Sequence, residues 1–235
     1  MQTNTLIIGS GIAGATAALC LSEDKERQIT LITRAKKAIN TNSQYAQGGI
    51  VGRGDDDAPN ILQEDILNAG DGICYPPAVK TLADEGPDLL REILIEQIGI
   101  SFDEKESGGL EYGLEAAHTK RRILHVGDMT GKAIMVALLR EIARRLNITI
   151  LTGHTAVDLI TFPHHARDPL ATYQPQICHG AYVYDRAQRK VIRILANQTI
   201  LASGGLGQIF LNTTNPGGAR GDGLAMAHRA GVRIA

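Results

Sequence analysis

The chain has 235 residues, 43% of them hydrophobic and 21% charged, a composition typical of one or two folded domains and unlike that of a disordered segment. Its 24 basic and 25 acidic side chains nearly cancel, so we expect neither nucleic acid nor an anionic membrane surface as a partner. The hydrophobic runs are shorter than the ~20 residues that span a bilayer, so membrane insertion is not expected either.

Features of a secreted protein are also absent from the sequence. The N-terminus lacks the basic flank and small-residue cleavage site of a signal peptide. Cys20, Cys74 and Cys178 are odd in number, widely spaced and form no Cys-x-x-Cys pattern. We therefore expect buried thiols in a cytoplasmic protein, and neither a disulfide framework nor a metal site.

The chain begins with a predicted βαβ unit, formed by a strand at 5–9, an Ala-rich helix at 13–21 and a strand at 29–33. Between the first strand and the helix lies Gly9-Ser10-Gly11-Ile12-Ala13-Gly14, which fits the Gly-x-Gly-x-x-Gly pattern of dinucleotide-binding folds. Such glycines allow a tight turn, close approach of a pyrophosphate and close packing of helix on strand, so the helix N-terminus faces negative charge. This position in the chain predicts nucleotide binding.

The end of the second predicted strand bears on which nucleotide is bound. NAD-binding units usually place an acidic residue there for the ribose hydroxyls, whereas this strand ends in Thr33-Arg34. An arginine is compatible with NADP. A later apolar strand, 199–202, ends in Ser203-Gly204-Gly205, as expected where a two-part FAD domain returns to its cofactor, and this favours FAD.

Polar, irregular sequence at 35–54 predicts an exposed loop, and helices are expected at 59–69 and 76–97. Gly86-Pro87 should interrupt the second helix, because proline cannot continue the hydrogen-bond ladder. Further elements are predicted as a short strand at 120–125, a helix at 130–146, and strands at 147–153, 154–162, 177–185 and 190–196.

The predicted fold class is therefore α/β, with a Rossmann-like FAD-binding parallel sheet, a smaller antiparallel β-sheet and flanking helices. The loop at 163–175 is rich in Pro and His and is interpreted as a variable insertion. Its His164-His165 pair has no further ligands in view and is not interpreted as a metal site.

Three segments resemble the succinate dehydrogenase, fumarate reductase and aspartate oxidase flavoprotein superfamily. They are the glycine loop, the segment Ser43-Gln44-Tyr45-Ala46-Gln47-Gly48-Gly49-Ile50, and the end of the chain, with Asn212-Thr213-Thr214-Asn215-Pro216 followed by Gly221-Asp222-Gly223-Leu224-Ala225-Met226-Ala227. Together they extend over nearly the whole chain. The resemblance implies FAD contacts at Gly9, Ser10, Gly11, Ile12, Ala13, Gly14, Arg34, Asn42, Ser43, Gln44, Tyr45, Ala46, Gln47, Gly48, Gly49, Val157, Ser203, Gly204, Gly205 and Asp222.

The resemblance also implies how FAD is attached. Covalent relatives have a histidine five residues before the glutamine of the Ala-Gln-Gly-Gly segment, and here that position is Asn42. An amide is not a competent nucleophile for the flavin methyl group, so we expect noncovalent FAD.

Within the superfamily, the segment from Glu115 to His125 is similar to the aspartate oxidase version. The resemblance implies that the Glu115 carboxylate faces the substrate ammonium, which needs a charged or hydrogen-bonding partner once desolvated. The alternative is a surface ion pair of Glu115 with Arg121 or Arg122. His118 and His125 are interpreted as structural, since a single histidine is more often packed or hydrogen-bonded in a core.

The activity implied by the resemblance is oxidation of L-aspartate to iminoaspartate, with hydride passing to flavin N5 and then to oxygen or fumarate. The product would feed quinolinate synthase in NAD biosynthesis. A succinate or fumarate oxidoreductase, and a non-catalytic FAD-binding fragment, are the alternatives.

The resemblance implies that residues 1–235 are the N-terminal portion of the FAD-binding domain. We therefore expect the family's lid domain, helical C-terminal domain, acid-base arginine and substrate histidine to lie outside these residues. We therefore expect binding without turnover from these residues alone, and no aspartate-dependent peroxide production.

Overall fold

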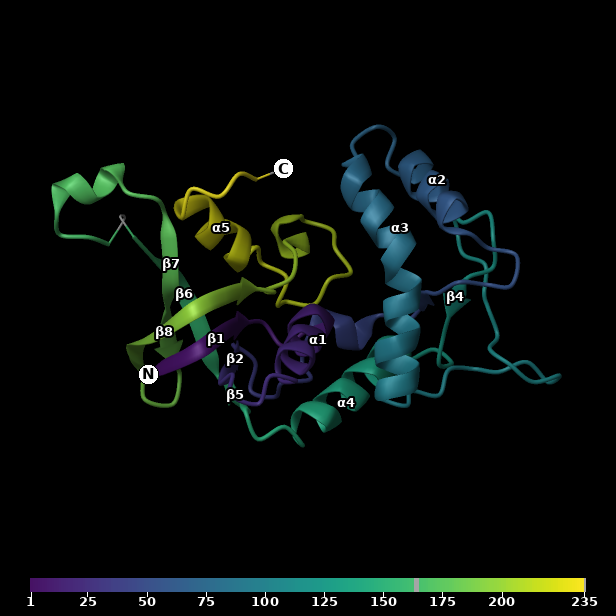
Figure 1. Cartoon of the computed structure of the whole chain (residues 1–235), viewed down its shortest axis with the longest axis horizontal. Coiled ribbons are helices and arrows are strands. Elements are labelled where there is room, and N and C mark those ends of the chain that lie inside the picture. The colour runs from purple at the N-terminus through teal and green to yellow at the C-terminus, as the bar shows by residue number, and fades with distance from the viewer. Residues whose placement is uncertain (163–164, 235) are drawn as a thin grey trace. The chain divides into compact units, whose positions relative to one another are not determined.

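The computed structural model describes residues 1–162 and 165–234, so His164 of the predicted His pair lies outside the described part (Figure 1). Clustering of contacts divides the chain into two compact units, unit 1 with Met1–Gln44 and Leu138–Ala235, and unit 2 with Tyr45–Ala137. The strands are β1 Gln2–Ile8, β2 Ile29–Thr33, β3 Ile50–Val51, β4 Ile123–Leu124, β5 Ile148–Thr152, β6 His154–Phe162, β7 Ile177–Asp185 and β8 Lys190–Leu201. The α-helices are α1 Ile12–Leu21, α2 Pro59–Ala69, α3 Pro76–Leu90, α4 Thr130–Ile142 and α5 Asp222–Arg229, with a π-helix at Arg91–Gln97 and short 3₁₀ helices at Asn42–Tyr45, Pro169–Tyr173 and Gly207–Ile209.

Unit 1 contains one six-stranded sheet in the order β5-β2-β1-β8-β7-β6. The strands β5, β2, β1 and β8 run parallel, and β7 is antiparallel to both of its neighbours. This arrangement confirms the α/β class with parallel and antiparallel parts. Strand β8 joins the two parts, because its first half pairs with β7 and its second half, from Leu195 to Leu201, pairs with β1.

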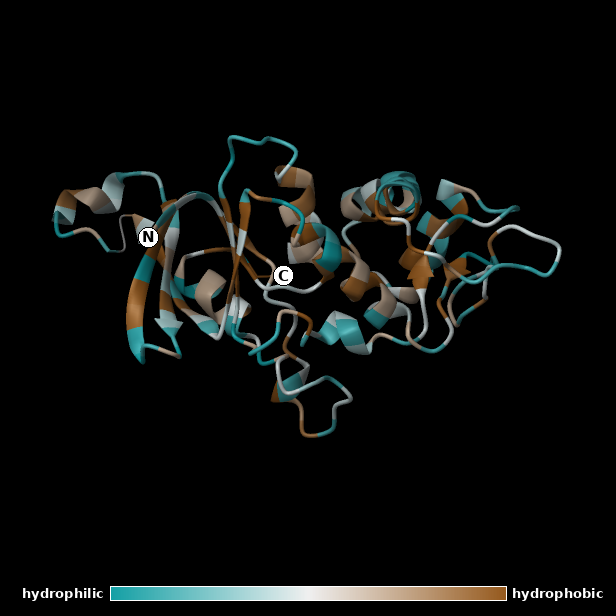
Figure 2. Ribbon diagram, turned by 90° about the horizontal axis from the view of Figure 1, so that it is seen from below, coloured by the Kyte–Doolittle hydropathy of each residue, from teal (hydrophilic) through white to brown (hydrophobic). Residues whose placement is uncertain are grey.

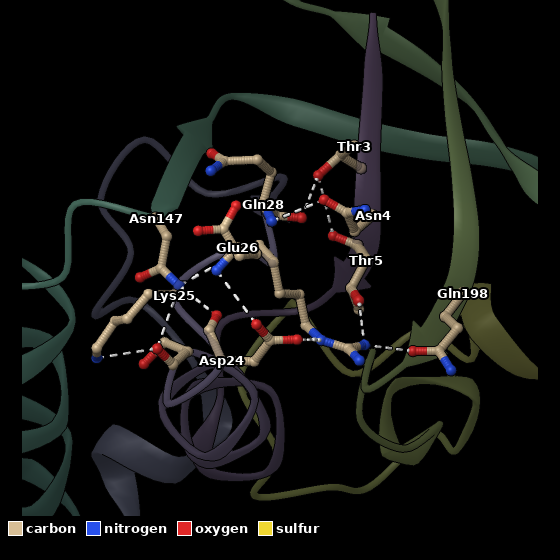
Figure 3. A network of polar contacts seen from close by, with 11 residues as sticks. Thr3, Asn4, Thr5, Asp24, Lys25, Glu26, Gln28, Asn147 and Gln198 are labelled. Atoms are coloured by element: carbon tan, nitrogen blue, oxygen red, sulfur yellow. Dashed lines mark hydrogen bonds and ion pairs between the residues drawn. The ribbon is translucent and has the colours of Figure 1, made fainter.

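The sequence predicted two separate strands, 190–196 and 199–202, where the structure has one. The polar pair Asn197-Gln198, whose residues are both exposed, lies between the two predicted strands. Pairing with β1 continues through Gln198, opposite Thr5. The Gln198 Oε1 atom accepts a hydrogen bond of 2.7 Å from Arg27, so the polar side chain is satisfied without leaving the strand (Figure 3).

The core of unit 1 lies between the parallel strands, the antiparallel strands and α5. Hydrophobic residues concentrate along the strands, as the colouring in Figure 2 shows. The core cluster consists of Leu6, Ile8, Ile32, Leu159, Ala181, Val183, Ile194, Ala196 and Met226. Burial of these side chains holds the antiparallel strands against the parallel ones.

A polar network holds the loop between α1 and β2. The Asn147 side-chain amide lies 3.1 Å from each of the carbonyl oxygens of Ser22, Asp24 and Arg27 (Figure 3). These carbonyls belong to the cap residue of α1 and to the loop that follows it. One residue just before β5 thereby anchors the end of α1.

The predicted interruption of the helix at Gly86-Pro87 is wrong, as α3 in unit 2 shows. The helix continues through Pro87, which is buried, and ends at Leu90, where the π-helix begins. A proline at 87 removes the N–H that would bond the Ala83 carbonyl. The Arg53 guanidinium instead lies 3.4 Å from the carbonyl oxygens of both Ala83 and Asp84, which replaces the missing donor.

The expectation of three buried thiols is wrong for Cys20, which is exposed on α1. The buried face of that helix consists of Gly14, Ala15, Ala18 and Leu19, and Cys20 falls outside it. Cys74 and Cys178 are partly buried. Within the described ranges, no helix is both long and apolar enough to cross a membrane.

Candidate functional site

The glycine loop joins β1 to α1 with conformations that only glycine accommodates well. Gly9 has φ +118°, and a Cβ atom there would lie 2.1 Å from the Ala202 carbonyl oxygen at the end of β8. A Cβ on Gly14 would lie 1.9 Å from the Gly9 carbonyl oxygen. Real Cβ atoms do not approach backbone this closely, so these two glycines permit the contact of α1 with the strand ends.

The N-terminus of α1 has N–H groups that the helix itself leaves without partners. The helix ladder starts with the Ala15 N–H, which bonds the Gly11 carbonyl at 2.9 Å, so the preceding N–H groups have no partner within the helix. The Ile12 N–H donates to Ser43 Oγ at 3.1 Å, and Ser10 Oγ donates to the Ala38 carbonyl at 2.8 Å. The loop after β2 is thereby held against the helix N-terminus, whose dipole favours a negatively charged group.

Two buried polar atoms in the same loop lack a hydrogen-bond partner, as do Arg53 Nη1 and Thr199 Oγ1 elsewhere among the described residues. Thr41 Oγ1 and Gln44 Oε1 are inaccessible to solvent and have no hydrogen-bond partner among the described residues. A buried polar atom without a partner costs about 1–3 kcal/mol, so such atoms are rare in folded proteins. A polar cofactor lying along this loop would supply the missing partners, and the residues therefore fit the cofactor that the sequence predicts.

The ends of β2 and α5 bring together two residues that the sequence predicted separately. Arg34 Nη1 lies 3.6 Å from Asp222 Oδ2, and Arg34 Nη2 donates to the Gly218 carbonyl at 3.2 Å. Arg220 Nη2 also bonds Asp222 Oδ2, at 2.9 Å. A carboxylate therefore does lie near the end of β2, although it comes from a residue 188 positions later in the chain than Arg34.

The loop that follows β8 carries Ser203, Gly204 and Gly205. Gly204 has φ +80°, and a Cβ atom on either glycine would meet no protein atom within 4 Å. A Cβ atom on Gly223 would lie only 1.8 Å from Ser203 Oγ. Sequence reasoning did not assign a role to Gly223, although it lies in the quoted Gly221-Asp222-Gly223 motif. A side chain at position 223 would therefore clash with the Ser203 side chain.

Val157, another predicted cofactor contact, lies on β6 and is 47% exposed. Its carbonyl oxygen accepts a hydrogen bond of 3.1 Å from Arg229 of α5. The structure thus places Val157 near α5 through a backbone contact, and its predicted contact with the cofactor stays a prediction.

In unit 2, the segment Tyr45–Gly49 lies against β4 and the start of α4. The Ala46 carbonyl accepts a hydrogen bond of 2.9 Å from the Gly131 N–H. A Cβ atom on Gly49 would lie 2.4 Å from Ile123 Cγ2 and 2.6 Å from the Leu124 carbonyl oxygen. Glycine is therefore required at position 49 for the segment to approach β4.

Glu115 lies beside this segment. A Cβ atom on Gly48 would lie 2.5 Å from Glu115 Oε1 and 3.4 Å from Oε2, so the carboxylate occupies the space that the glycine leaves open. The Glu115 residue is exposed and begins a turn in which the His118 N–H bonds its carbonyl at 3.2 Å. The structure thus places the Glu115 carboxylate next to the predicted flavin-contacting segment.

The alternative interpretation of the sequence was a surface ion pair of Glu115 with Arg121 or Arg122. Arg122 has other partners and is fully buried. Its Nε and Nη2 atoms donate to the two carboxylate oxygens of Asp57 at 2.8 and 2.7 Å, and Nη1 donates to Asp65 Oδ2 at 2.5 Å. Nη1 also lies 2.9 Å from His118 Nδ1. His118 thus belongs to a buried polar cluster, in agreement with a structural role.

The pKa of Asp65 is held below its ordinary value. Burial of the carboxylate would raise this pKa, but hydrogen bonds from the Thr119 N–H, from Arg122 and from the Thr119 hydroxyl, together with the charge of Arg122, outweigh it. For Arg122, burial would lower the pKa, but the hydrogen bonds and charges of Asp57 and Asp65 raise it. Both groups are therefore charged at neutral pH.

This cluster predicts an acid-sensitive unit 2. Because folding lowers the pKa of Asp65 from 3.8, its contribution to stability is complete above that value and is lost as pH falls through the lower, folded-state pKa. In urea titrations between pH 7 and pH 2, we expect the free energy of unfolding to fall below about pH 4. The free energy of unfolding of the Asp65→Asn variant should fall less over that range. An equal fall in the variant would show that Asp65 does not cause the acid sensitivity. Comparison with this variant is needed because Asp185, in unit 1, also has a lowered pKa, through hydrogen bonds from Gln188 and Ala187.

The chain resembles known proteins over almost its entire length. The FAD binding domain family matches residues 4–235. The chain is 37% identical to the L-aspartate oxidase of Halobacterium salinarum, 38% to that of Pseudomonas aeruginosa and 38% to the chloroplastic L-aspartate oxidase of Arabidopsis thaliana. These alignments cover 99%, 99% and 95% of this chain and 43%, 43% and 33% of the respective relatives, so the chain spans less than half of their length.

Solved structures share the fold. A quinol fumarate reductase from E. coli superposes with a TM-score of 0.86 at 22% identity, over 97% of this chain and 37% of that one. The Sdh1 complex of Mycobacterium smegmatis superposes with a TM-score of 0.85 at 23% identity, over 97% of this chain and 39% of that one. At these identities the likeness establishes the architecture.

Proposed function

The chain belongs to the FAD-binding domain family, and we propose that it supplies the cofactor-binding portion of an enzyme that oxidises L-aspartate to iminoaspartate. The relatives named L-aspartate oxidase support this substrate, since they align with 95–99% of the chain. The observation that carries the proposal is the position of Glu115, whose carboxylate lies beside Gly48 in the predicted flavin-contacting segment.

The proposal gives a role to the glycine loop, to the segment that contains Gly48 and Gly49, and to Glu115. FAD, when bound, supplies the acceptor for the hydride that leaves the substrate α-carbon, with oxygen or fumarate as the final acceptor. The N-terminus of α1 and Ser43 would hold its pyrophosphate. The backbone at Gly48 and Gly49 would lie along the flavin, and Glu115 would hold the substrate ammonium so that the α-carbon is correctly oriented.

An assay of the full-length protein with two substrates tests the proposal. We expect aspartate-dependent formation of peroxide, or of succinate when fumarate is the acceptor, and little oxidation of succinate. Preference for succinate over aspartate would instead identify a succinate or fumarate oxidoreductase. An imine hydrolyses in water, so the product would need an enzyme that consumes it promptly, and we propose quinolinate synthase for this role, with both enzymes in the cytoplasm.

The attachment of FAD gives a separate prediction. With Asn42 in the position of the covalent histidine, FAD should be released when the purified protein is precipitated with acid. Yellow colour that stays with the pellet would contradict noncovalent binding.

The loop after β8 allows a test of cofactor contact that leaves the protein intact. A Cβ atom on Gly205 meets no protein atom within 4 Å, so Gly205→Ala should change the free energy of unfolding by less than about 0.5 kcal/mol. If the loop lies against FAD, the added methyl group should weaken FAD binding, measured by quenching of flavin fluorescence. Gly217→Ala is the matched control, since its Cβ also meets nothing within 4 Å. Equal FAD affinity for both variants would show that Gly205 does not contact FAD.

A further inference from the structure

We propose that Thr119 and Asp65 are positioning residues for Glu115, so that the buried Arg122 cluster controls how firmly the substrate ammonium is held. This inference rests on the proposed function of Glu115. It concerns residues of unit 2 that neither the sequence motifs nor the family resemblance assigned to the site.

The first step in the argument is the exposure of Glu115. An exposed glutamate has several accessible rotamers and loses conformational entropy when it is held in one place. A carboxylate that binds an ammonium in one fixed position therefore needs a backbone that is ordered before the substrate binds. On one side of Glu115 the backbone is held at Gly113, which bonds Ile123 of β4 at 2.8 Å, and on the other side it enters the turn that follows Glu115.

That turn is short and has an unusual conformation. Its closing hydrogen bond runs from the His118 N–H to the Glu115 carbonyl, and Ala117 between them has φ +67°. A residue with a Cβ atom in the left-handed region is uncommon and persists where the surroundings determine the conformation. His118, which closes the turn, and Thr119, which follows it, are the residues that bond to the surrounding side chains.

Thr119 is bound to the side chain of Asp65 on α2 by two hydrogen bonds. Its N–H and its hydroxyl donate to Asp65 Oδ2 at 3.0 and 3.1 Å. Asp65 is 4% exposed and also accepts from Arg122, which is 0% exposed. Hydrogen bonds to a buried, charged acceptor are among the stronger ones in proteins.

His118 is bound to the same cluster. A guanidinium can only donate, so His118 Nδ1, at 2.9 Å from Arg122 Nη1, must accept, and the ring hydrogen lies on Nε2. The two residues His118 and Thr119 are thus held by buried charges, and the Glu115 carboxylate lies against Gly48. The cluster therefore acts on Glu115 through the turn. We assign no contact with the substrate to the cluster itself.

Thr119→Val in the full-length enzyme is the test. The residue is exposed and retains its N–H bond to Asp65, so the variant should fold and retain FAD. We expect the KM for aspartate to rise about tenfold with little change in kcat, because loss of one hydrogen bond to a charged group loosens a residue that binds the ammonium in the ground and transition states alike. Thr119→Ser keeps the hydroxyl and should restore the wild-type KM.

Two comparisons separate positioning from a general structural role. Thr81→Val removes another exposed threonine hydroxyl of unit 2, bonded to the Pro77 carbonyl, and should leave the KM unchanged. In a Glu115→Gln background, Thr119→Val should have no further effect on aspartate, because two residues that act through one contact are not additive. The same tenfold rise in that background, or an equal rise for succinate, would overturn the proposal.

A readout without substrate keeps this inference distinct from the proposed function. Hydrogen exchange of the His118 amide should be faster in Thr119→Val than in wild type and Thr119→Ser, because that amide closes the turn. If the wild-type enzyme does not oxidise aspartate, the proposed function fails while this measurement still applies. Equal exchange in all three proteins would refute positioning by Thr119.

Discussion

Replacement of Glu115 by glutamine in the full-length enzyme should lower kcat/KM for aspartate by about 30- to 1,000-fold, which corresponds to about 2–4 kcal/mol of lost transition-state binding. Glutamine keeps the size of the side chain and much of its hydrogen bonding but removes the charge. The substrate ammonium would then be desolvated without a charged partner, which is costly. Steady-state kinetics with aspartate measure the loss.

Succinate and fumarate provide the control for this variant. They have no ammonium, and a neutral side chain no longer repels their carboxylates, so their binding should be unchanged or improved and specificity should shift toward them. Glu115 is exposed in unit 2, and an exposed charge pair is worth less than about 1 kcal/mol. A large effect therefore also requires that substrate binding exclude water from Glu115. Equal losses for aspartate and fumarate, or none for either, would make Glu115 a structural residue.

The second large effect is expected for Gly14→Ala, which should abolish retention of FAD and lower the melting temperature. The new Cβ would lie 1.9 Å from the Gly9 carbonyl oxygen and 3.3 Å from Ile7 Cγ2. The first of these atoms is backbone, so α1 has to move away from β1, and overpacking of this kind costs about 1–3 kcal/mol or more. The movement displaces the helix N-terminus from the position in which it would hold a pyrophosphate.

Gly86→Ala is the matched control, because it is also a glycine-to-alanine change inside a helix. Its Cβ would meet only the Leu82 side chain, at 3.3 Å, and alanine favours the helix over glycine by about 0.5–1 kcal/mol. We expect FAD retention equal to wild type and an equal or higher melting temperature. Flavin absorbance after gel filtration and thermal unfolding followed by circular dichroism measure both quantities. Full FAD retention by Gly14→Ala would contradict the role assigned to the glycine loop.

Much of the fold was predictable because it depends on local rules. The βαβ unit follows from apolar runs of the length of strands and helices and from glycines at fixed spacing, and the structure has β1, α1 and β2 there. Strands β6 and β7 agree with their predicted bounds for the same reason. The continuity of β8 was missed because it depends on β1, whose hydrogen bonds hold Asn197 and Gln198 in a strand despite their polarity.

The candidate site divides in the same way. The amino-acid sequence by itself determined the glycine loop and the motif around Glu115, since steric demands and charge are properties of single residues in a short segment. Only the tertiary structure decided which charges meet. Arg122 pairs with Asp57 and Asp65, between 57 and 65 residues away, and Arg34 meets Asp222. Ion pairing depends on distance in space and on burial, and neither can be read from the order of residues along the chain.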